Sequence, residues 1–221
     1  IAGSRSGNPA NDLWELPLSG PAAMQWQALA PQGVPPSPRW GVVMVMDSTR
    51  DRALVIAGGA YSMDPTMDVF ALDLSTTPPT WSELVTFGAP PARTLAAGVI
   101  DPEADRFVLY GGYNGVFEGA AWALPLSGTP EWSYLHPSGQ TPAPRTCSAI
   151  YDNAGRQMVI PSGYNNGMLE DVVVLRFDEQ AASVSVVDSL IEMDRVLLTW
   201  GVSGAASMTG SVERRTATDW W

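Results

Sequence analysis

The sequence has few of the residues that build covalent, metal-bound or membrane-spanning architectures. It contains one cysteine, Cys147, and one histidine, His136, so an internal disulfide framework and a multi-histidine metal site are excluded within these 221 residues. No apolar stretch approaches the ~20 residues that a membrane-spanning helix needs, so no membrane insertion is expected. Charged residues make up only 16% and hydrophobic residues 45%, which is typical of a globular chain.

The charge balance sets a second limit. The chain has 12 basic residues, all of them arginine, against 23 acidic ones, which gives a net charge of −11. Nucleic acids and anionic membranes are bound through clustered basic residues that displace counterions, so neither is expected as a partner. The acidic balance favours neutral or basic partners instead.

Glycine and proline are abundant, with 21 and 19 residues spread along the chain, which suits many short elements joined by tight turns. Several landmarks recur with a shared period of about 52 residues, and such a period is the signature of a repeat architecture. The landmarks are an arginine after a proline-rich stretch (Arg39, Arg93, Arg145), the second glycine of a pair (Gly59, Gly112, Gly163) and a tryptophan (Trp26, Trp81, Trp132).

Each repeat is expected to form four antiparallel strands. Runs such as WGVVMVMD and TLAAGVID end in aspartate, which opens a turn by accepting backbone N–H groups. A second apolar strand then stops at a glycine pair, as in FVLYGG, and a loop leads to an alternating strand such as DVFALDL. A short strand with tryptophan closes the unit. The glycines are expected to end the strand through positive φ or close packing, since a phosphate loop would require a following helix.

These repeats resemble the Kelch repeat, whose pattern is an arginine-led first strand, a double glycine after the second, an aromatic on the third and a tryptophan on the fourth. The resemblance covers about residues 1–187 and implies an all-β fold of β-propeller blades. We expect a partial blade over 1–38 and blades over 39–92, 93–144 and 145–187. The last blade departs from the pattern, with Ser162-Gly163 for the glycine pair, Val173 at the aromatic position and no fourth-strand tryptophan. The third- and fourth-strand aromatics are expected to pack in the core or between blades (Trp14, Phe70, Trp122, Trp26, Trp81, Trp132).

About three and a half blades make an incomplete propeller, because closed rings have roughly 4–8 blades and an open stack exposes apolar faces. We expect a longer parent chain, a homo-oligomer or another chain to complete the ring, or the last segment to contribute strands. Residues 188–221 break the pattern. They resemble part of a fibronectin type III domain, with Trp200 as the buried strand aromatic and VERR as the following strand. The alternative is that they complete the last blade.

One face of the predicted propeller collects the candidate binding residues. Successive connections of a meander alternate between the two ends of its strands, so the second-to-third-strand loops and the repeat-to-repeat connections share a face. The Kelch resemblance implies that this face binds partners. The candidates are Arg39, Arg93, Arg145, Tyr61, Tyr113, Asn114, Tyr164 and Asn165. Together they suit a carbohydrate or an acidic peptide, through stacking and planar hydrogen bonds. The alternative is structural, with arginines that tie blades through a carboxylate or carbonyls and asparagines in left-handed loop positions.

No catalytic or metal-binding constellation is visible, and no cofactor is expected. The pairs Asp47/Asp51 and Asp101/Asp105 suit turns better than calcium, because the dense oxygen ligands and fixed glycine of a calcium loop are missing. Cys147 lies among small apolar residues without a nearby histidine, which indicates a buried thiol and not a nucleophile.

The sequence therefore predicts a non-enzymatic binding or scaffolding module for a protein or carbohydrate ligand. One alternative is a fragment of a propeller enzyme, a carbohydrate-active oxidase, epimerase or lyase, with its catalytic residues outside this chain. The single histidine excludes the two-histidine copper site of the galactose oxidase kind. Another alternative is a purely structural subunit. The acidic balance, the lack of lysine and the fibronectin-like neighbour favour a bacterial protein that is secreted or displayed at the cell surface.

Overall fold

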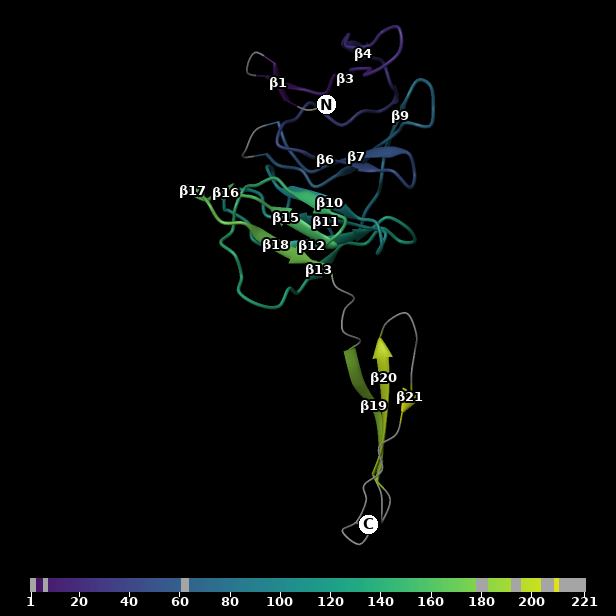
Figure 1. The fold of residues 1–221 in the computed structure, drawn as a ribbon, viewed down its shortest axis with the longest axis vertical. Helices are drawn as coiled ribbons and strands as arrows, with labels where there is room; N and C mark the ends of the chain where they lie inside the picture. The colour runs from purple at the N-terminus through teal and green to yellow at the C-terminus, as the bar shows by residue number, and fades with distance from the viewer. Residues whose placement is uncertain are drawn as a thin grey trace. The chain divides into compact units, whose positions relative to one another are not determined.

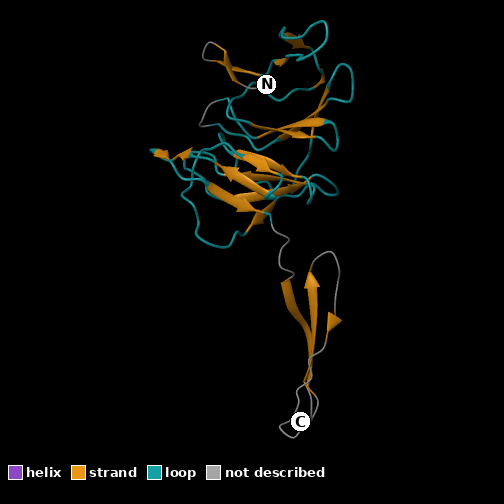
Figure 2. Cartoon of the chain, viewed as in Figure 1, coloured by secondary structure: helices purple, strands orange, loops and turns teal. Residues whose placement is uncertain are grey.

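The computed structural model describes residues 3–5, 8–60, 64–177, 183–191, 196–203 and 209–210. The regular elements among these residues are β-strands (Figure 2). The described residues contain no helix long and apolar enough to cross a membrane. The chain divides into two compact units, Ile1–Arg176 and Phe177–Trp221. The first unit holds a stack of small antiparallel sheets (Figure 1), as the repeat pattern predicts for propeller blades.

The repeat over 39–92 forms a complete four-stranded meander. Its strands are β6 (Val43–Asp47), β7 (Arg52–Ile56), β8 (Val69–Asp73) and β9 (Thr80–Glu83), each antiparallel to the next. Asp51 takes a positive φ of 46° in the turn between β6 and β7, a conformation that aspartate tolerates better than most residues. The predicted strand–turn–strand pattern is therefore confirmed in this blade.

The repeat over 93–144 has the same construction. Its strands are β10 (Ala97–Asp101), β11 (Arg106–Tyr110), β12 (Ala121–Pro125) and β13 (Ser133–Leu135), again all antiparallel. Asp105 takes the turn position of Asp51, with a φ of 47°. Two successive blades thus share their strand order and their turn chemistry.

The outer two repeats form smaller sheets in the described residues. The first contains β1 (Gly3–Arg5), β2 (Asn8–Ala10), β3 (Leu13–Glu15) and β4 (Gln27–Leu29), in the hairpins β1-β2 and β3-β4. The last contains β14 (Ile150–Asp152), β15 (Gln157–Ile160), β16 (Gly163–Tyr164), β17 (Met168–Leu169) and β18 (Val173–Arg176), in the sheets β14-β15-β18 and β16-β17. The fold is an incomplete propeller, as predicted.

The glycine pair after β11 ends its strand for two physical reasons, and this prediction is confirmed. Gly111 and Gly112 have φ of 70° and 107°, which side-chain-bearing residues rarely adopt. A Cβ on Gly111 would lie 2.5 Å from the carbonyl oxygen of Arg145 in the next blade. In the preceding blade the equivalent positions are Ala57 and Gly58, with φ of 63° and 87°. The alignment of Gly59 with Gly112 is therefore wrong by one residue.

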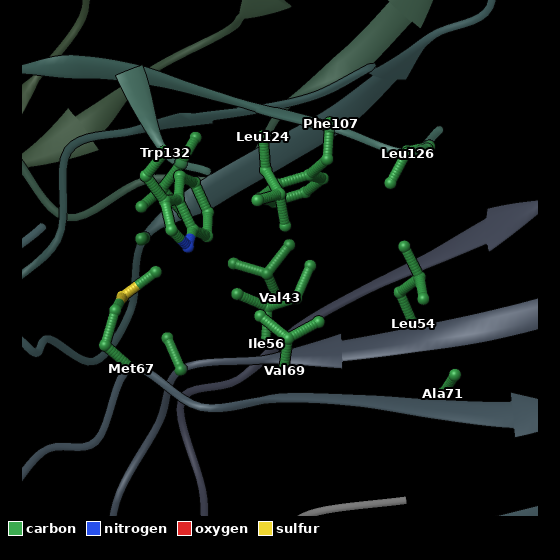
Figure 3. Packing of buried hydrophobic residues seen from close by; sticks show 13 residues of the cluster. Val43, Leu54, Ile56, Met67, Val69, Ala71, Phe107, Leu124, Leu126 and Trp132 are labelled. Carbon is green, nitrogen blue, oxygen red and sulfur yellow. The ribbon is translucent and has the colours of Figure 1, made fainter. Parts of the chain in front are cut away.

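The core lies between sheets. The largest cluster joins β6, β7 and β8 to β11, β12 and Trp132 (Figure 3), and Phe107 meets Trp132 edge to face at 5.9 Å between ring centroids. A second cluster joins Leu13 of the first repeat to Val55, Phe70, Leu72 and Trp81. Burying a Val, Leu or Phe side chain contributes about 1.5–3 kcal/mol, so these inter-blade contacts stabilise the stack substantially.

The predicted burial of the strand aromatics is confirmed where a second sheet covers them. Phe70, Trp81 and Trp132 are buried, and Trp122 packs at the edge of the large cluster. The prediction is wrong for Trp14 and Trp26, which are 48% and 66% exposed. Both lie in the first repeat, where no described sheet packs against the outer side. Burial of a blade residue depends on the neighbouring blade as much as on its own strand.

The first two connections between repeats each add a short segment to the outer strand of the next blade. β5 (Gln32–Gly33) pairs parallel with β9 at Thr80 and Trp81. Gly33 has a φ of 77°, and a Cβ there would lie 2.1 Å from the carbonyl oxygen of Trp81. The same parallel pairing recurs one blade later, between Phe87 and the segment ahead of β13. There the Trp132 amide donates to the carbonyl of Phe87 at 2.8 Å.

The second unit contains an antiparallel sheet of β19 (Ser183–Ile191), β20 (Val196–Ser203) and β21 (Thr209–Gly210). Trp200 lies in β20, within the segment predicted as a strand. The VERR segment lies outside the described residues, so the likeness to a fibronectin type III domain stays a prediction.

Candidate functional site

The candidate site lies on the face formed by the second-to-third-strand connections, residues 57–68, 111–120 and 161–172, which we call the loop face. In Figure 1, β16 and β17, which belong to the third of these connections, project from one side of the stack. Tyr61, one of the predicted ligand-binding residues, lies outside the described residues.

Arg39 and Arg145 are buried beneath the loop face and bound within their own blades. The Arg39 guanidinium is bonded to both carboxylate oxygens of Asp68 and to Thr66 Oγ1 at 2.9 Å. Arg145 makes the same bidentate pair with Asp171, at 2.6 and 2.8 Å. This pair raises the pKa of Arg145 and lowers the pKa of Asp171. Both arginines are therefore neutralised inside the protein.

Among the described residues, no carboxylate pairs with Arg93, the arginine of the middle blade. Its Nε donates to the carbonyl of Pro91 at 2.9 Å and its Nη1 to the carbonyl of Gly111 at 3.0 Å, while Nη2 is buried without a hydrogen bond. Ala120 stands at the position that corresponds to Asp68. Burial lowers the pKa of Arg93, and the charge of nearby Glu118 opposes that shift. In the part of the chain that the structure describes, Arg93 is therefore a buried cation without the carboxylate pair that Arg39 and Arg145 have.

The backbone of these arginines also joins neighbouring blades. The Gly58 amide donates to the carbonyl of Arg93 at 3.0 Å, and the Gly112 amide donates to the carbonyl of Arg145 at 2.8 Å. These contacts fit the structural role of Arg39, Arg93 and Arg145, in which they tie neighbouring blades together. None of these three arginine residues is more than 2% exposed.

An aromatic row crosses from the middle blade to the last one. The Tyr113 and Phe117 rings lie 5.1 Å apart between centroids, and Phe117 meets Tyr164 edge to face at 5.9 Å. Tyr164 is 47% exposed. The structure thus brings two of the three predicted tyrosines together through Phe117, which the sequence interpretation missed. The sequence could have pointed to Phe117, because it is the one phenylalanine in the three loop-face connections.

The predicted asparagines support the loops around this row. Asn114 Nδ2 donates to Glu118 Oε1 at 2.9 Å, and Asn165 Nδ2 donates to the carbonyl of Pro144 at 2.8 Å. Asn165 therefore ties the last loop to the connection between the two blades. These bonds hold the aromatic row in place from both sides.

The opposite ends of the strands carry the aspartate turns. Asp47 and Asp101 are 1% exposed and pair with Arg52 and Arg106 at 2.8 and 3.0 Å. The turn role predicted for these aspartates agrees with the contacts. In the ranges that the structure describes, no group of three or more His, Cys, Asp or Glu side chains could hold a metal ion.

The family described as the KLHDC2/KLHL20/DRC7 Kelch-repeats domain matches residues 2–196. The chain belongs to the Kelch-repeat family. The Kelch resemblance predicted from the arginine, glycine and tryptophan landmarks is thereby confirmed.

Individual Kelch relatives are distant. The chain is 28% identical over 187 residues to the serine/threonine-protein phosphatase BSL2 of Arabidopsis thaliana, covering 83% of this chain and 17% of that protein. It is 28% identical over 190 residues to human host cell factor 1, covering 79% of this chain and 9% of that protein. The chain therefore spans less than a fifth of either relative.

A solved structure supports the propeller fold. The structure of YjhT matches 77% of this chain and 50% of its own chain, with a TM-score of 0.59 and 18% sequence identity. At this identity the likeness concerns the Kelch fold alone. It agrees with the blade stack, which provides part of a ring.

Proposed function

We propose that this Kelch chain is a binding or scaffolding module that engages a protein partner through the aromatic row of its loop face. Membership of the Kelch family is consistent with such a module. The observation that carries the proposal is the row Tyr113, Phe117 and Tyr164, contributed by two blades and partly open to solvent. Asn114 and Asn165 position it.

A protein partner suits this surface better than a carbohydrate. Val116 and Met168 flank the row and are 64% and 83% exposed, and aromatic and methionine side chains are enriched at protein interfaces. The rings of the row meet one another at steep angles, so each edge contact occupies part of a flat face that a sugar would stack on. Because Arg39, Arg93 and Arg145 are buried, none of these three guanidinium groups is exposed to bond sugar hydroxyls.

The test is selection of a random twelve-residue peptide library, displayed on phage, against the full 221-residue chain. We expect peptides that bind the wild type and lose binding to the Tyr164→Ala and Phe117→Ala variants. Phe87→Ala is the matched control, because Phe87 is 57% exposed and pairs through its backbone with the outer rim of the next blade. Circular dichroism checks that each variant is folded.

Selected peptides that bind folded Tyr164→Ala and Phe117→Ala as tightly as the wild type would overturn the placement of the site. If the library yields no binder while a glycan array yields one that depends on Tyr164, the ligand is a carbohydrate and the protein-partner proposal fails.

A further inference from the structure

The exposed charge of the loop face is acidic, although three arginines belong to it by sequence. Its connections, residues 57–68, 111–120 and 161–172, contain five acidic residues and no basic one. The acidic residues are Asp64, Asp68, Glu118, Glu170 and Asp171. The arginines that lead each blade are at most 2% exposed and contribute no accessible cation.

The acidic groups differ in what they can offer to a ligand. Asp68 is bound to Arg39, whereas the side chain of Asp171 stays 52% exposed beside Arg145. Glu170 is exposed and adjacent to Asp171 in the chain. Glu118 is half-buried, accepts from Asn114 and directly follows Phe117. A carboxylate therefore directly follows Phe117 in the middle blade, and two more stand at the end of the loop that carries Tyr164 in the last blade.

Aromatic rings beside carboxylates favour cationic side chains. A guanidinium or ammonium group is attracted to a ring face within about 6 Å and to a neighbouring carboxylate. The protein already contains one such arrangement, because the Arg39 guanidinium lies 5.7 Å from the Phe70 centroid while it is bound to Asp68. The exposed ring of Tyr164 and the carboxylates of Glu170 and Glu118 repeat these elements at the surface.

We propose that the partner presents a cationic, arginine- or lysine-bearing peptide segment to the loop face, with a basic side chain against Tyr164 and the carboxylates of Glu118 and Glu170. This inference rests on the proposed function, since it names the chemistry of the partner at the same site. It replaces the acidic-peptide ligand that accessible arginines would have favoured.

The test uses two labelled nine-residue peptides, one repeating Arg-Phe-Gly and one repeating Glu-Phe-Gly, titrated into the full chain by fluorescence anisotropy. We expect binding of the arginine peptide alone, weakened roughly three- to ten-fold by Glu118→Gln/Glu170→Gln, as the loss of two exposed charge pairs implies. The control Glu15→Gln/Asp51→Asn removes the same charge at the opposite ends of the strands, where both residues are exposed, and should change affinity less than two-fold, about the scatter for uninvolved surface charges.

Equal weakening by both double variants would overturn the inference, because the peptide would then respond to net charge and not to this face. Its failure is distinct from that of the proposed function. If library peptides require Tyr164 but are enriched in acidic residues, the loop face binds proteins and the cationic partner is wrong. If Tyr164→Ala leaves binding of every peptide unchanged, both proposals fail.

Discussion

Replacing Ala120 with aspartate should give the middle blade the ion pair that its neighbours have. The backbone places Ala120 as it places Asp68, since the amides two residues earlier donate to equivalent glycine carbonyls, Thr66 to Gly58 at 2.7 Å and Glu118 to Gly112 at 2.9 Å. Arg93 Nη2 is buried and unbonded.

A hydrogen bond to a charged group contributes about 1.5–3 kcal/mol, and desolvation of the new carboxylate offsets part of it. We therefore expect Ala120→Asp to raise the free energy of unfolding by about 1–2 kcal/mol, which in a chain of this size raises Tm by roughly 2–8 °C.

Differential scanning calorimetry measures this effect, and two variants serve as controls. Arg93→Met should abolish the gain from Ala120→Asp, because the carboxylate then has no cation to pair with. Asp68→Ala should destabilise the preceding blade by about 3 kcal/mol, since it leaves Arg39 buried without its partner. A Tm that falls or stays constant in Ala120→Asp, while Asp68→Ala lowers it, would refute the equivalence of the two blades.

Three further predictions concern packing, acid stability and thiol reactivity. Gly111→Ala should destabilise the fold by more than about 2 kcal/mol in urea melts, whereas Gly115→Ala, with a positive φ but nothing within 4 Å, should cost only about 1 kcal/mol. The hydrogen bond from Arg50 lowers the pKa of Asp105 below its ordinary 3.8, so the stability it adds is present above pH 3.8 and is lost as pH falls through the lowered pKa. Arg50→Gln should remove this component of acid unfolding, and an unchanged pH profile would contradict the assignment. Burial raises the pKa of Cys147 to about 11, so Ellman's reagent at pH 8 should label the unfolded chain quickly and the native chain slowly.

The parts of the fold that depend on short stretches of sequence were predictable. The alternating run over β10, the aspartate turn that follows it and the glycines after β11 each have a local cause, in side-chain periodicity, turn chemistry and positive φ. Repetition of these stretches at one period then identified the blades, because the same local solution recurs in each.

The candidate site was less predictable, because it depends on partners far apart in the sequence. The roles of Arg39 and Arg145 depend on carboxylates 29 and 26 residues away, which burial and pairing reveal only in the folded blade. Ala57 adopts the left-handed conformation that the sequence interpretation reserved for glycine, so the glycine alignment slipped by one. Phe117 belongs to the candidate site because its ring contacts Tyr164 of the next blade, and no sequence pattern within its own repeat reveals that contact.

The strand β5 has a consequence for how such a chain can be recombined. By sequence Gln32 and Gly33 end the first repeat, yet they pair with the outermost strand of the second, and Phe87 does the same one blade later. A repeat excised from Arg39 onward would lack β5, the segment that pairs with its outermost strand β9. A blade that is to be transplanted should instead begin ahead of Gln32 or Phe87, so that it includes the segment that pairs with its outermost strand.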